Sequence, residues 1–363
     1  MNMAIKFYYI DDDNEASNGY ITGFSQNDLI VEKIEGNDFD TIISIIKEKK
    51  DICGLILDHK LDEISMSNGI HLKFRGTSIA QEIRNRQVSK DTDYNITDFP
   101  IILLSATENI KNSLDDSGKD LFDLLIIKDD LSPKSYFKWI VELTSLFLAY
   151  KKISEIKVLE NLLSVKQDSL DFRFVEYLSD LINSKPVHVI SQFVFKHLIL
   201  RQGMLINENT LAARLGIDKE NSSDWNNVLG NLNEAKYEGV FSEGWECWWM
   251  FKINYWWSGF SKKPLRTLSS NERIEIIKDK LQLPEVKPIE KLPMADSSHF
   301  WTICKGTNKP IDEIDGLIIS GQSNLYPWQE YEYVSLNAAV NNINIENWKD
   351  LSPISKIRLS EFQ

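Results

Sequence analysis

The chain has 363 residues, of which 42% are hydrophobic and 26% are charged, values typical of a globular protein with two or three domains. The formal net charge is −13, of which residues 1–150 contribute −10 and residues 151–363 contribute −3. Neither part is basic enough for non-specific nucleic-acid binding. No apolar stretch reaches the roughly 18 residues of a membrane span.

The start of the chain lacks the shape of a signal peptide. Cys53, Cys247 and Cys304 are scattered and odd in number, which suggests neither a disulfide framework nor a zinc site. We therefore expect a cytoplasmic protein with reduced thiols and no membrane contact.

Short apolar runs alternate with helical patterns in the first 150 residues. Strands are predicted at Ile5–Ile10, Leu29–Ile34, Ile52–Asp58, Pro100–Leu104 and Leu121–Ile127. Helices are predicted at Phe39–Lys50 and Ser78–Arg86, and a long one opens at Ser132-Pro133. This alternation predicts an α/β fold with a doubly wound, five-stranded parallel sheet.

Four of the predicted strands end in residues that carry chemistry. Asp11 and Asp12 follow the first strand, Asp58 ends the third, Ser105 follows the fourth and Lys128 follows the fifth. Clustered carboxylates suit Mg²⁺, and a carboxylate can act as a nucleophile toward a phosphoryl group. A hydroxyl and an ammonium group can meet the charge on the transferred oxygens. Charged residues are common where strands give way to loops, but four such ends in this order outweigh that explanation.

With this set of residues, the segment 4–150 resembles a response-regulator receiver domain, a flavodoxin-like fold. The resemblance implies that a histidine kinase or phosphotransfer protein phosphorylates Asp58, that Ser105 follows the phosphoryl group and that Lys128 pairs with it. It also implies a Mg²⁺ site formed by Asp12, Asp58, the backbone carbonyl of Lys60 and, through water, Asp11.

Several positions depart from the family pattern. Lys128 is followed by Asp129 where the family usually has proline, and the switch position holds Leu125 instead of an aromatic residue. The first helix contains Gly19 and Gly23, which are poor helix formers. The leucine leaves open whether phosphorylation is coupled to output in the usual way.

The segment Asp62–Gly76 replaces the usual short turn after Asp58. It includes Met66, Asn68, Gly69, His71 and Arg75. Surface insertions are usually neutral, but this one adjoins the predicted phosphorylation site. A lid or a kinase-selecting role is therefore a second hypothesis for it.

The stretch from Pro133 to Ser164 contains no glycine and no further proline, and it predicts a long connecting helix. Its first half must pack on the sheet. Its second half is a signalling helix, a dimer seam or a helix that folds back onto the C-terminal region. A homodimer is therefore a hypothesis.

The region after residue 189 has a pattern similar to a winged helix. Helices are predicted at Val189–Gln202, Thr210–Ile217 and Asp224–Lys236, followed by a wing strand at Tyr237–Phe241. Lys236 is the only basic side chain of the expected reading helix, and DNA phosphates normally need Arg and Lys. A winged-helix shape that contacts protein is at least as well supported as one that binds DNA.

The segment Trp245–Phe260 is dense in aromatic residues, with the pairs Trp248-Trp249 and Trp256-Trp257 eight residues apart. On one helix these pairs would share a face, and we expect Trp248 and Trp256 to belong to the core. A proline-punctuated linker with a helix near Asn271–Leu281 follows. Strand-like stretches after residue 300 then predict a small α+β unit.

We therefore divide the chain into a receiver domain (1–150), connecting helices (151–188), a helical, winged-helix-like, Trp-rich domain (189–260), and a linker with a small α+β unit (261–363). No phosphate loop, nucleophile elbow or metal-hydrolase motif is present, so we expect a phospho-accepting regulator and not an enzyme, although an unfamiliar C-terminal enzyme stays open. The preferred function is a phosphorylation-switched adaptor with a downstream protein partner.

Two alternatives stay open. One is a DNA-binding transcription regulator, and the other is a phosphate-buffering regulator that draws phosphoryl groups from a shared kinase. The overall layout is similar to that of regulators in phosphorelay-type antiphage operons such as Detocs, which adds antiviral defence as an expected setting.

Overall fold

The computed structural model describes residues 4–36, 38–61, 74–106 and 116–362, and it divides the chain into two compact units. Unit 1 comprises residues 1–163, 176–193 and 239–244, and unit 2 comprises residues 164–175, 194–238 and 245–363. The four-part division expected from the sequence stays a prediction.

Unit 1 is built on a five-stranded sheet in which all neighbouring strands are parallel. The strands are β1 (Ile5–Ile10), β2 (Leu29–Lys33), β3 (Gly54–Asp58), β4 (Ile101–Ser105) and β5 (Leu124–Ile127), in the order β2-β1-β3-β4-β5. All residues of β3 and β4 are buried, as expected for parallel strands covered on both faces. The prediction of a doubly wound, five-stranded parallel sheet is confirmed, and the strand order is that of the flavodoxin-like receiver fold.

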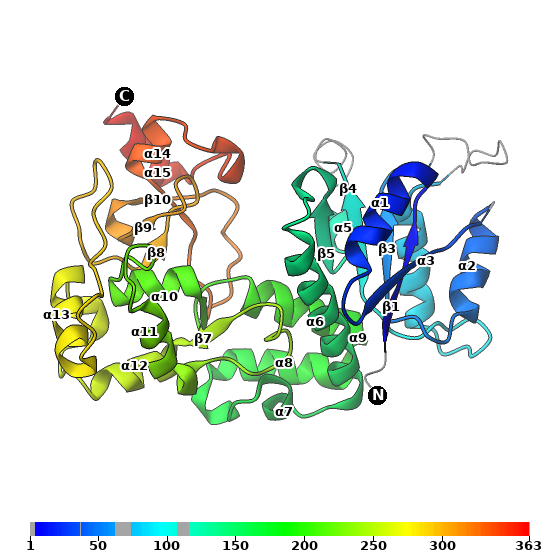
Figure 1. Cartoon of the computed structure of the whole chain (residues 1–363), viewed down its shortest axis with the longest axis horizontal. Helices are drawn as coiled ribbons and strands as arrows, with labels where there is room; N and C mark the ends of the chain where they lie inside the picture. The colour runs from blue at the N-terminus through cyan, green and yellow to red at the C-terminus, as the bar shows by residue number, and fades with distance from the viewer. Residues whose placement is uncertain (1–3, 37, 62–73, 107–115, 363) are drawn as a thin grey trace. The chain divides into compact units, whose positions relative to one another are not determined.

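Helices cover both faces of this sheet (Figure 1). On one face, α2 (Phe39–Glu48) and α3 (Gly76–Gln87) contribute Ile42, Ile46, Ile79 and Ile83 to one buried cluster. On the other face, α1 (Asn14–Phe24) and α6 (Tyr136–Glu155) pack on a second cluster. Short helical turns at α5 (Asp116–Lys119) and at Lys128–Asp130 flank β5.

The predicted continuous helix from Pro133 to Ser164 is wrong in its second half. Helix α6 ends at Glu155, Ile156 has extended backbone angles, and a separate short helix, α7 (Leu159–Leu163), follows. Leu159, Leu162 and Leu163 are buried, so packing stabilises this short second helix.

Helix α6 is also packed on a second side by a distant part of unit 1. A Cβ atom added to Gly244 would lie 2.9 Å from the Cβ of Ser145, so residues 239–244 lie directly against this helix. Glu142 and Ser145 are buried there. Within unit 1, α8 (Phe172–Ser184) contributes its residues from Glu176 onward, and α9 (Val187–Val194) follows.

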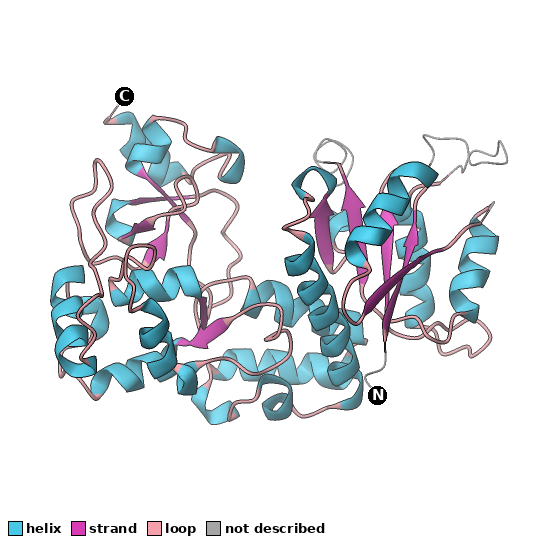
Figure 2. Ribbon diagram, in the orientation of Figure 1, coloured by secondary structure: helices cyan, strands magenta, loops and turns pink. Residues whose placement is uncertain are grey.

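Unit 2 combines helices with short two-stranded sheets (Figure 2). Its helices are α10 (Glu208–Leu215), α11 (Trp225–Asn231), α12 (Met250–Ser258), α13 (Ser270–Leu281), α14 (Leu336–Val340) and α15 (Pro353–Ser360), with a π-helical turn at Phe195–Ile199. Its strands are β6 (Leu205–Asn207), β7 (Cys247–Trp249), β8 (Thr302–Ile303), β9 (Pro310–Ile311), β10 (Gly316–Ile318) and β11 (Tyr333–Ser335). Short 3₁₀ turns lie at Gln167–Ser169, Asn233–Ala235, Leu265–Thr267, Glu313–Asp315 and Ile345–Asn347.

The predicted wing strand at Tyr237–Phe241 is wrong. No residue of this segment belongs to a strand. Val240 and Phe241 lie in a turn, and Phe241 has a φ of +73°, which is incompatible with a strand. Strand β7 instead pairs antiparallel with β6. Helices α10 and α11 do form near their predicted positions, so the region keeps two successive helices without the predicted wing.

The predicted tryptophan stripe on one helix is also wrong. Trp248 lies in strand β7, whereas Trp256 and Trp257 lie in helix α12, because the chain changes from strand to helix at Met250. Trp248 is buried, as expected. Trp257 is buried as well, whereas Trp256 is half-buried against the same cluster.

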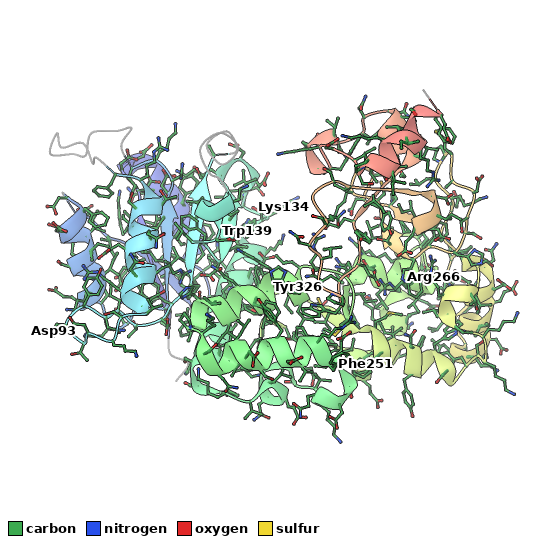
Figure 3. The ribbon with its side chains drawn as sticks, turned by 180° about the vertical axis from the view of Figure 1, so that it is seen from behind. Asp93, Lys134, Trp139, Phe251, Arg266 and Tyr326 are labelled. Atoms are coloured by element: carbon green, nitrogen blue, oxygen red, sulfur yellow. The ribbon has the colours of Figure 1, made fainter. Side chains whose placement is uncertain are left out.

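Buried arginines and stacked aromatic rings organise the interior of unit 2. The Nη1 atom of Arg273 donates hydrogen bonds to the carbonyl oxygens of Arg214, at 2.8 Å, and Phe300, at 2.9 Å. Tyr326, labelled in Figure 3, stacks on Trp328 with 4.6 Å between ring centroids. The segment predicted as a linker is thus joined to the rest of unit 2 through α13.

All three cysteines are buried thiols without disulfide partners. Within the described ranges, no helix combines the length and the apolar character needed to cross a membrane.

Candidate phosphoryl-acceptor and metal site

The parallel sheet brings the predicted chemical residues to one edge. Asp58 ends β3, Ser105 ends β4, and Lys128 directly follows β5. Asp11 and Asp12 directly follow β1, which lies next to β3. Because carboxyl ends of parallel strands meet at the same edge, residues far apart in the sequence converge there.

Three carboxylates form a tight, buried cluster at this edge. Asp11, Asp12 and Asp58 each offer an oxygen atom within 4.8 Å of the others. Their exposed fractions are only 3%, 4% and 5%. Buried like charges at this spacing repel one another unless a cation balances them.

Lys128 supplies one positive charge to the cluster. Its Nζ atom lies 2.6 Å from Oδ1 of Asp58 and 3.3 Å from Oδ2 of Asp11. Burial opposes the charged form of this lysine, but the two carboxylates outweigh that effect and raise the pKa of Lys128. Burial also raises the pKa of Asp58 to about 6, although Lys128 acts in the opposite direction.

The backbone after β3 holds the Asp58 side chain and packs closely behind it. The backbone N–H of Lys60 donates to Oδ2 of Asp58 over 2.8 Å. The backbone N–H of Gly76 donates to the carbonyl oxygen of His59, and a Cβ atom added at Gly76 would lie 2.1 Å from the carbonyl oxygen of Asp58. Only glycine fits this approach without displacing the end of β3.

Most of the predicted lid falls on residues 62–73, which include Met66, Asn68, Gly69 and His71 and lie outside the described residues. Arg75 is exposed at the N-terminus of α3. The lid hypothesis and the backbone-carbonyl role of Lys60 therefore stay predictions.

The Ser105 hydroxyl is buried at the sheet edge and could donate a hydrogen bond to an oxygen atom bound there. Its side chain is fully buried, and its Oγ atom has no hydrogen-bond partner among the described residues. Leaving a buried hydroxyl unpaired costs about 1–3 kcal/mol. The position at the end of β4 allows this hydroxyl to donate to a group held on the same sheet edge.

Three further residues at the site were missed in the sequence. The Tyr9 hydroxyl donates to Oδ2 of Asp11, and burial raises the pKa of Tyr9 well above its usual value. Lys33, which ends β2, donates to the Ser17 hydroxyl over 3.0 Å, and burial lowers its pKa against the opposing effect of Asp11. The Tyr20 ring lies 5.3 Å from the Nζ atom of Lys128.

Two of these three residues left a usable signal. Tyr9 lies two positions before Asp11, so both side chains leave β1 on the same face. Lys33 occupies the end of the second strand, the one strand end that the prediction did not consider. Tyr20 lies on α1, and its approach to Lys128 depends on how that helix packs.

Leu125, at the switch position, lies on β5 and packs against the buried cluster on the α2 and α3 face. The leucine at this position therefore packs as an ordinary core residue. Its effect on coupling stays a prediction.

The donor set fits Mg²⁺. This ion prefers oxygen ligands, is usually bound by one or two carboxylates and retains several waters. The three clustered carboxylates supply such oxygens, and the single charge of Lys128 leaves negative charge for a cation to balance.

No family model matches the chain, and no curated protein matches it. Among solved structures, the chain is similar to an adenylate cyclase from Rhodopirellula baltica, with 13% identity, a TM-score of 0.31, and coverage of 43% of this chain and 96% of that one. It is similar to a CheY-like receiver domain from Methylobacillus flagellatus, with 12% identity, a TM-score of 0.26, and coverage of 36% and 91%. It is also similar to a Francisella response-regulator receiver domain, with 17% identity, a TM-score of 0.28, and coverage of 40% and 97%.

These likenesses are too distant to assign an activity. The receiver-type fold of unit 1 rests on its own strand order and on the residues gathered at its sheet edge.

Proposed function

We propose that this chain is a cytoplasmic response regulator of a two-component phosphorelay, and that Asp58 accepts a phosphoryl group from a histidine kinase or phosphotransfer protein. One observation carries the proposal. Asp58 lies buried beside Asp11 and Asp12, and its carboxylate forms an ion pair with Lys128. A structural ion pair needs no such surplus of buried carboxylates, whereas phosphoryl transfer uses it to hold a cation.

The proposed transfer is a substitution at phosphorus. A carboxylate oxygen of Asp58 attacks the phosphorus atom of a phosphohistidine on the donor protein. The P–O bond forms as the P–N bond breaks, and the leaving histidine nitrogen keeps the electron pair and takes up a proton from solvent. Asp58 must be ionised to attack, and the Lys128 ammonium favours that form.

The surrounding residues position the reacting groups. Asp11, Asp12 and Asp58 would hold Mg²⁺, which supplies positive charge for the phosphoryl oxygens when it is bound. Lys128 is close enough to Asp58 to turn from the carboxylate to a phosphoryl oxygen on it. The unpaired Ser105 hydroxyl would donate to another of these oxygens.

The test is phosphorylation of the full chain by acetyl phosphate, followed by intact mass. The wild-type protein should gain one phosphoryl group only when Mg²⁺ is present, and Asp58→Asn should gain none. Asp51→Asn is the matched control, because Asp51 is an exposed aspartate paired with Lys6 outside the cluster. Equal labelling of wild type and Asp58→Asn would contradict the assignment.

For output, we propose contact with a downstream protein through unit 2. Large apolar side chains are exposed there, including Phe172 (73%), Tyr255 (82%) and Ile354 (80%). We propose that a protein partner covers these side chains, since their burial in an interface would remove apolar area from water. On α11, Asn226, Asn227 and Asn231 are exposed, but neither a basic side chain nor the predicted wing accompanies them. We therefore place DNA binding second.

Two measurements separate the alternatives. Tight, salt-sensitive binding to random DNA would favour the transcription regulator. Phosphorylation without a change in hydrogen exchange in unit 2 would favour the phosphate buffer over the adaptor. We propose no enzymatic activity beyond self-catalysed phosphorylation and dephosphorylation, and the homodimer and the antiphage setting stay predictions.

A further inference from the structure

Tyr9 is a buried tyrosine whose hydroxyl faces the carboxylate cluster. Its side chain is 1% exposed on β1, and its hydroxyl donates to Oδ2 of Asp11. The receiver resemblance of this chain rests on the strand-end residues and gives Tyr9 no role. Its hydroxyl is nevertheless one of the polar groups in direct contact with the cluster.

Asp11 is held by three donors in the described structure. Oδ1 accepts the backbone N–H of Asp13 over 2.8 Å, and Oδ2 is shared between the Tyr9 hydroxyl and the Lys128 ammonium, the latter 3.3 Å away. Lys128 lies closer to Asp58, at 2.6 Å, so it divides its charge between two carboxylates. Tyr9 is therefore the side-chain donor to Asp11 that is not shared with Asp58.

We propose that Tyr9 is a positioning residue that fixes the Asp11 carboxylate toward the cation and holds it there when Lys128 turns to a phosphoryl group on Asp58. The inference rests on the proposed function, because it concerns the same site. A carboxylate with its rotation already fixed loses less freedom when it binds a cation. Without the phenol hydroxyl, Asp11 would retain Lys128 as its side-chain donor and compete for it with the phosphoryl group.

The variant Tyr9→Phe removes one oxygen atom and keeps the buried ring. Tyr8→Phe is a matched control on the same strand. The Tyr8 side chain leaves β1 on the opposite face and packs in the other buried cluster, and its hydroxyl donates to Oδ1 of Asp51 over 2.9 Å. Both variants delete one buried phenol oxygen bonded to an aspartate, but only one of these aspartates belongs to the site.

The experiment measures Mg²⁺ binding to the unphosphorylated full chain by calorimetry, with thermal unfolding in EDTA recorded in parallel. Tyr9→Phe should weaken Mg²⁺ binding about tenfold, the size expected for one hydrogen bond to a charged group. Tyr8→Phe should leave the affinity unchanged. In an Asp11→Asn background, Tyr9→Phe should produce no further loss, since its effect passes through Asp11.

A purely structural role would lower the unfolding temperature of Tyr9→Phe and leave its Mg²⁺ affinity at the wild-type value, and that result overturns the inference. Tighter Mg²⁺ binding by Tyr9→Phe overturns it as well. The two proposals fail in distinguishable ways. Absence of Mg²⁺ binding by the wild-type chain refutes the proposed function together with this inference, whereas normal binding by both proteins refutes the inference alone.

Discussion

Replacing Asp123 by alanine removes a buried carboxylate at the start of β5, away from the proposed phosphorylation site. Its Oδ2 atom accepts hydrogen bonds from Nη2 of Arg84, at 2.7 Å, and from the backbone N–H of Ile101, at 2.8 Å. Its Oδ1 atom accepts the Tyr150 hydroxyl over 2.7 Å. One side chain thus joins α3, β4 and α6 to the amino end of β5.

The expected loss of stability follows from burial. The Arg84 and Asp123 side chains are 5% and 1% exposed, so alanine would leave a guanidinium group buried without its counter-charge. Breaking such a pair by removing one partner costs about 3–5 kcal/mol. With a urea dependence of about 2 kcal/mol per molar, the unfolding midpoint of unit 1 should fall by about 2 M.

The assay is urea unfolding of the full chain, followed by pulsed hydrogen exchange in the peptide that contains β4. The matched control is Asp51→Ala. Asp51 also pairs with a cation and a tyrosine hydroxyl, those of Lys6 and Tyr8, but its side chain is 53% exposed. Water screens that pair, so its loss should shift the midpoint several times less. Equal shifts for the two variants would refute the argument from burial.

Four other substitutions give distinct outcomes. Gly76→Ala should abolish Mg²⁺-dependent phosphorylation by acetyl phosphate while the chain still folds, because its Cβ atom would lie 2.1 Å from the carbonyl oxygen of Asp58; wild-type labelling would contradict this. On α1, Gly19→Ala should raise the thermal unfolding temperature, because a Cβ atom added there meets nothing within 4 Å. Gly23→Ala should lower that temperature, because its Cβ atom would lie 2.2 Å from the ring of Tyr136 on α6. Burial lowers the pKa of His188 to about 4. Wild type should therefore lose stability relative to His188→Leu as the pH falls from 6.5 toward 4, because the unfolded state takes up the proton first, and a constant difference in urea midpoint across that range would contradict it.

The receiver sheet could be predicted because its inner strands are buried on both faces. A run such as Gly54–Asp58 is almost wholly apolar and stops at a carboxylate, so both the strand and its functional end are visible in the sequence. The sequence-based predictions were wrong where one spacing of apolar residues fits both a helix and a strand. The aromatic residues of Trp245–Phe260 satisfy helical spacing, yet the pairing of β7 with β6 places the first pair in a strand.

The end of α6 at Glu155 was not predictable from local signals, since neither glycine nor proline marks it. In the candidate site, the charged strand ends were visible, whereas Tyr9 lies in an apolar run and only its spacing of two residues from Asp11 marks it. Gly23 was expected to weaken α1, and the structure supplies a reason for it, because the ring of Tyr136 occupies the space that a Cβ atom would need.

The most direct test of the central claim is binding of beryllofluoride, a phosphoryl analogue, measured by fluorine NMR with and without Mg²⁺. We expect one bound group per wild-type chain, strictly dependent on Mg²⁺, and none in Asp58→Asn. Binding that persists without Mg²⁺, or that survives in Asp58→Asn, would contradict the claim that the cluster of Asp11, Asp12 and Asp58 is a cation-assisted phosphoryl acceptor.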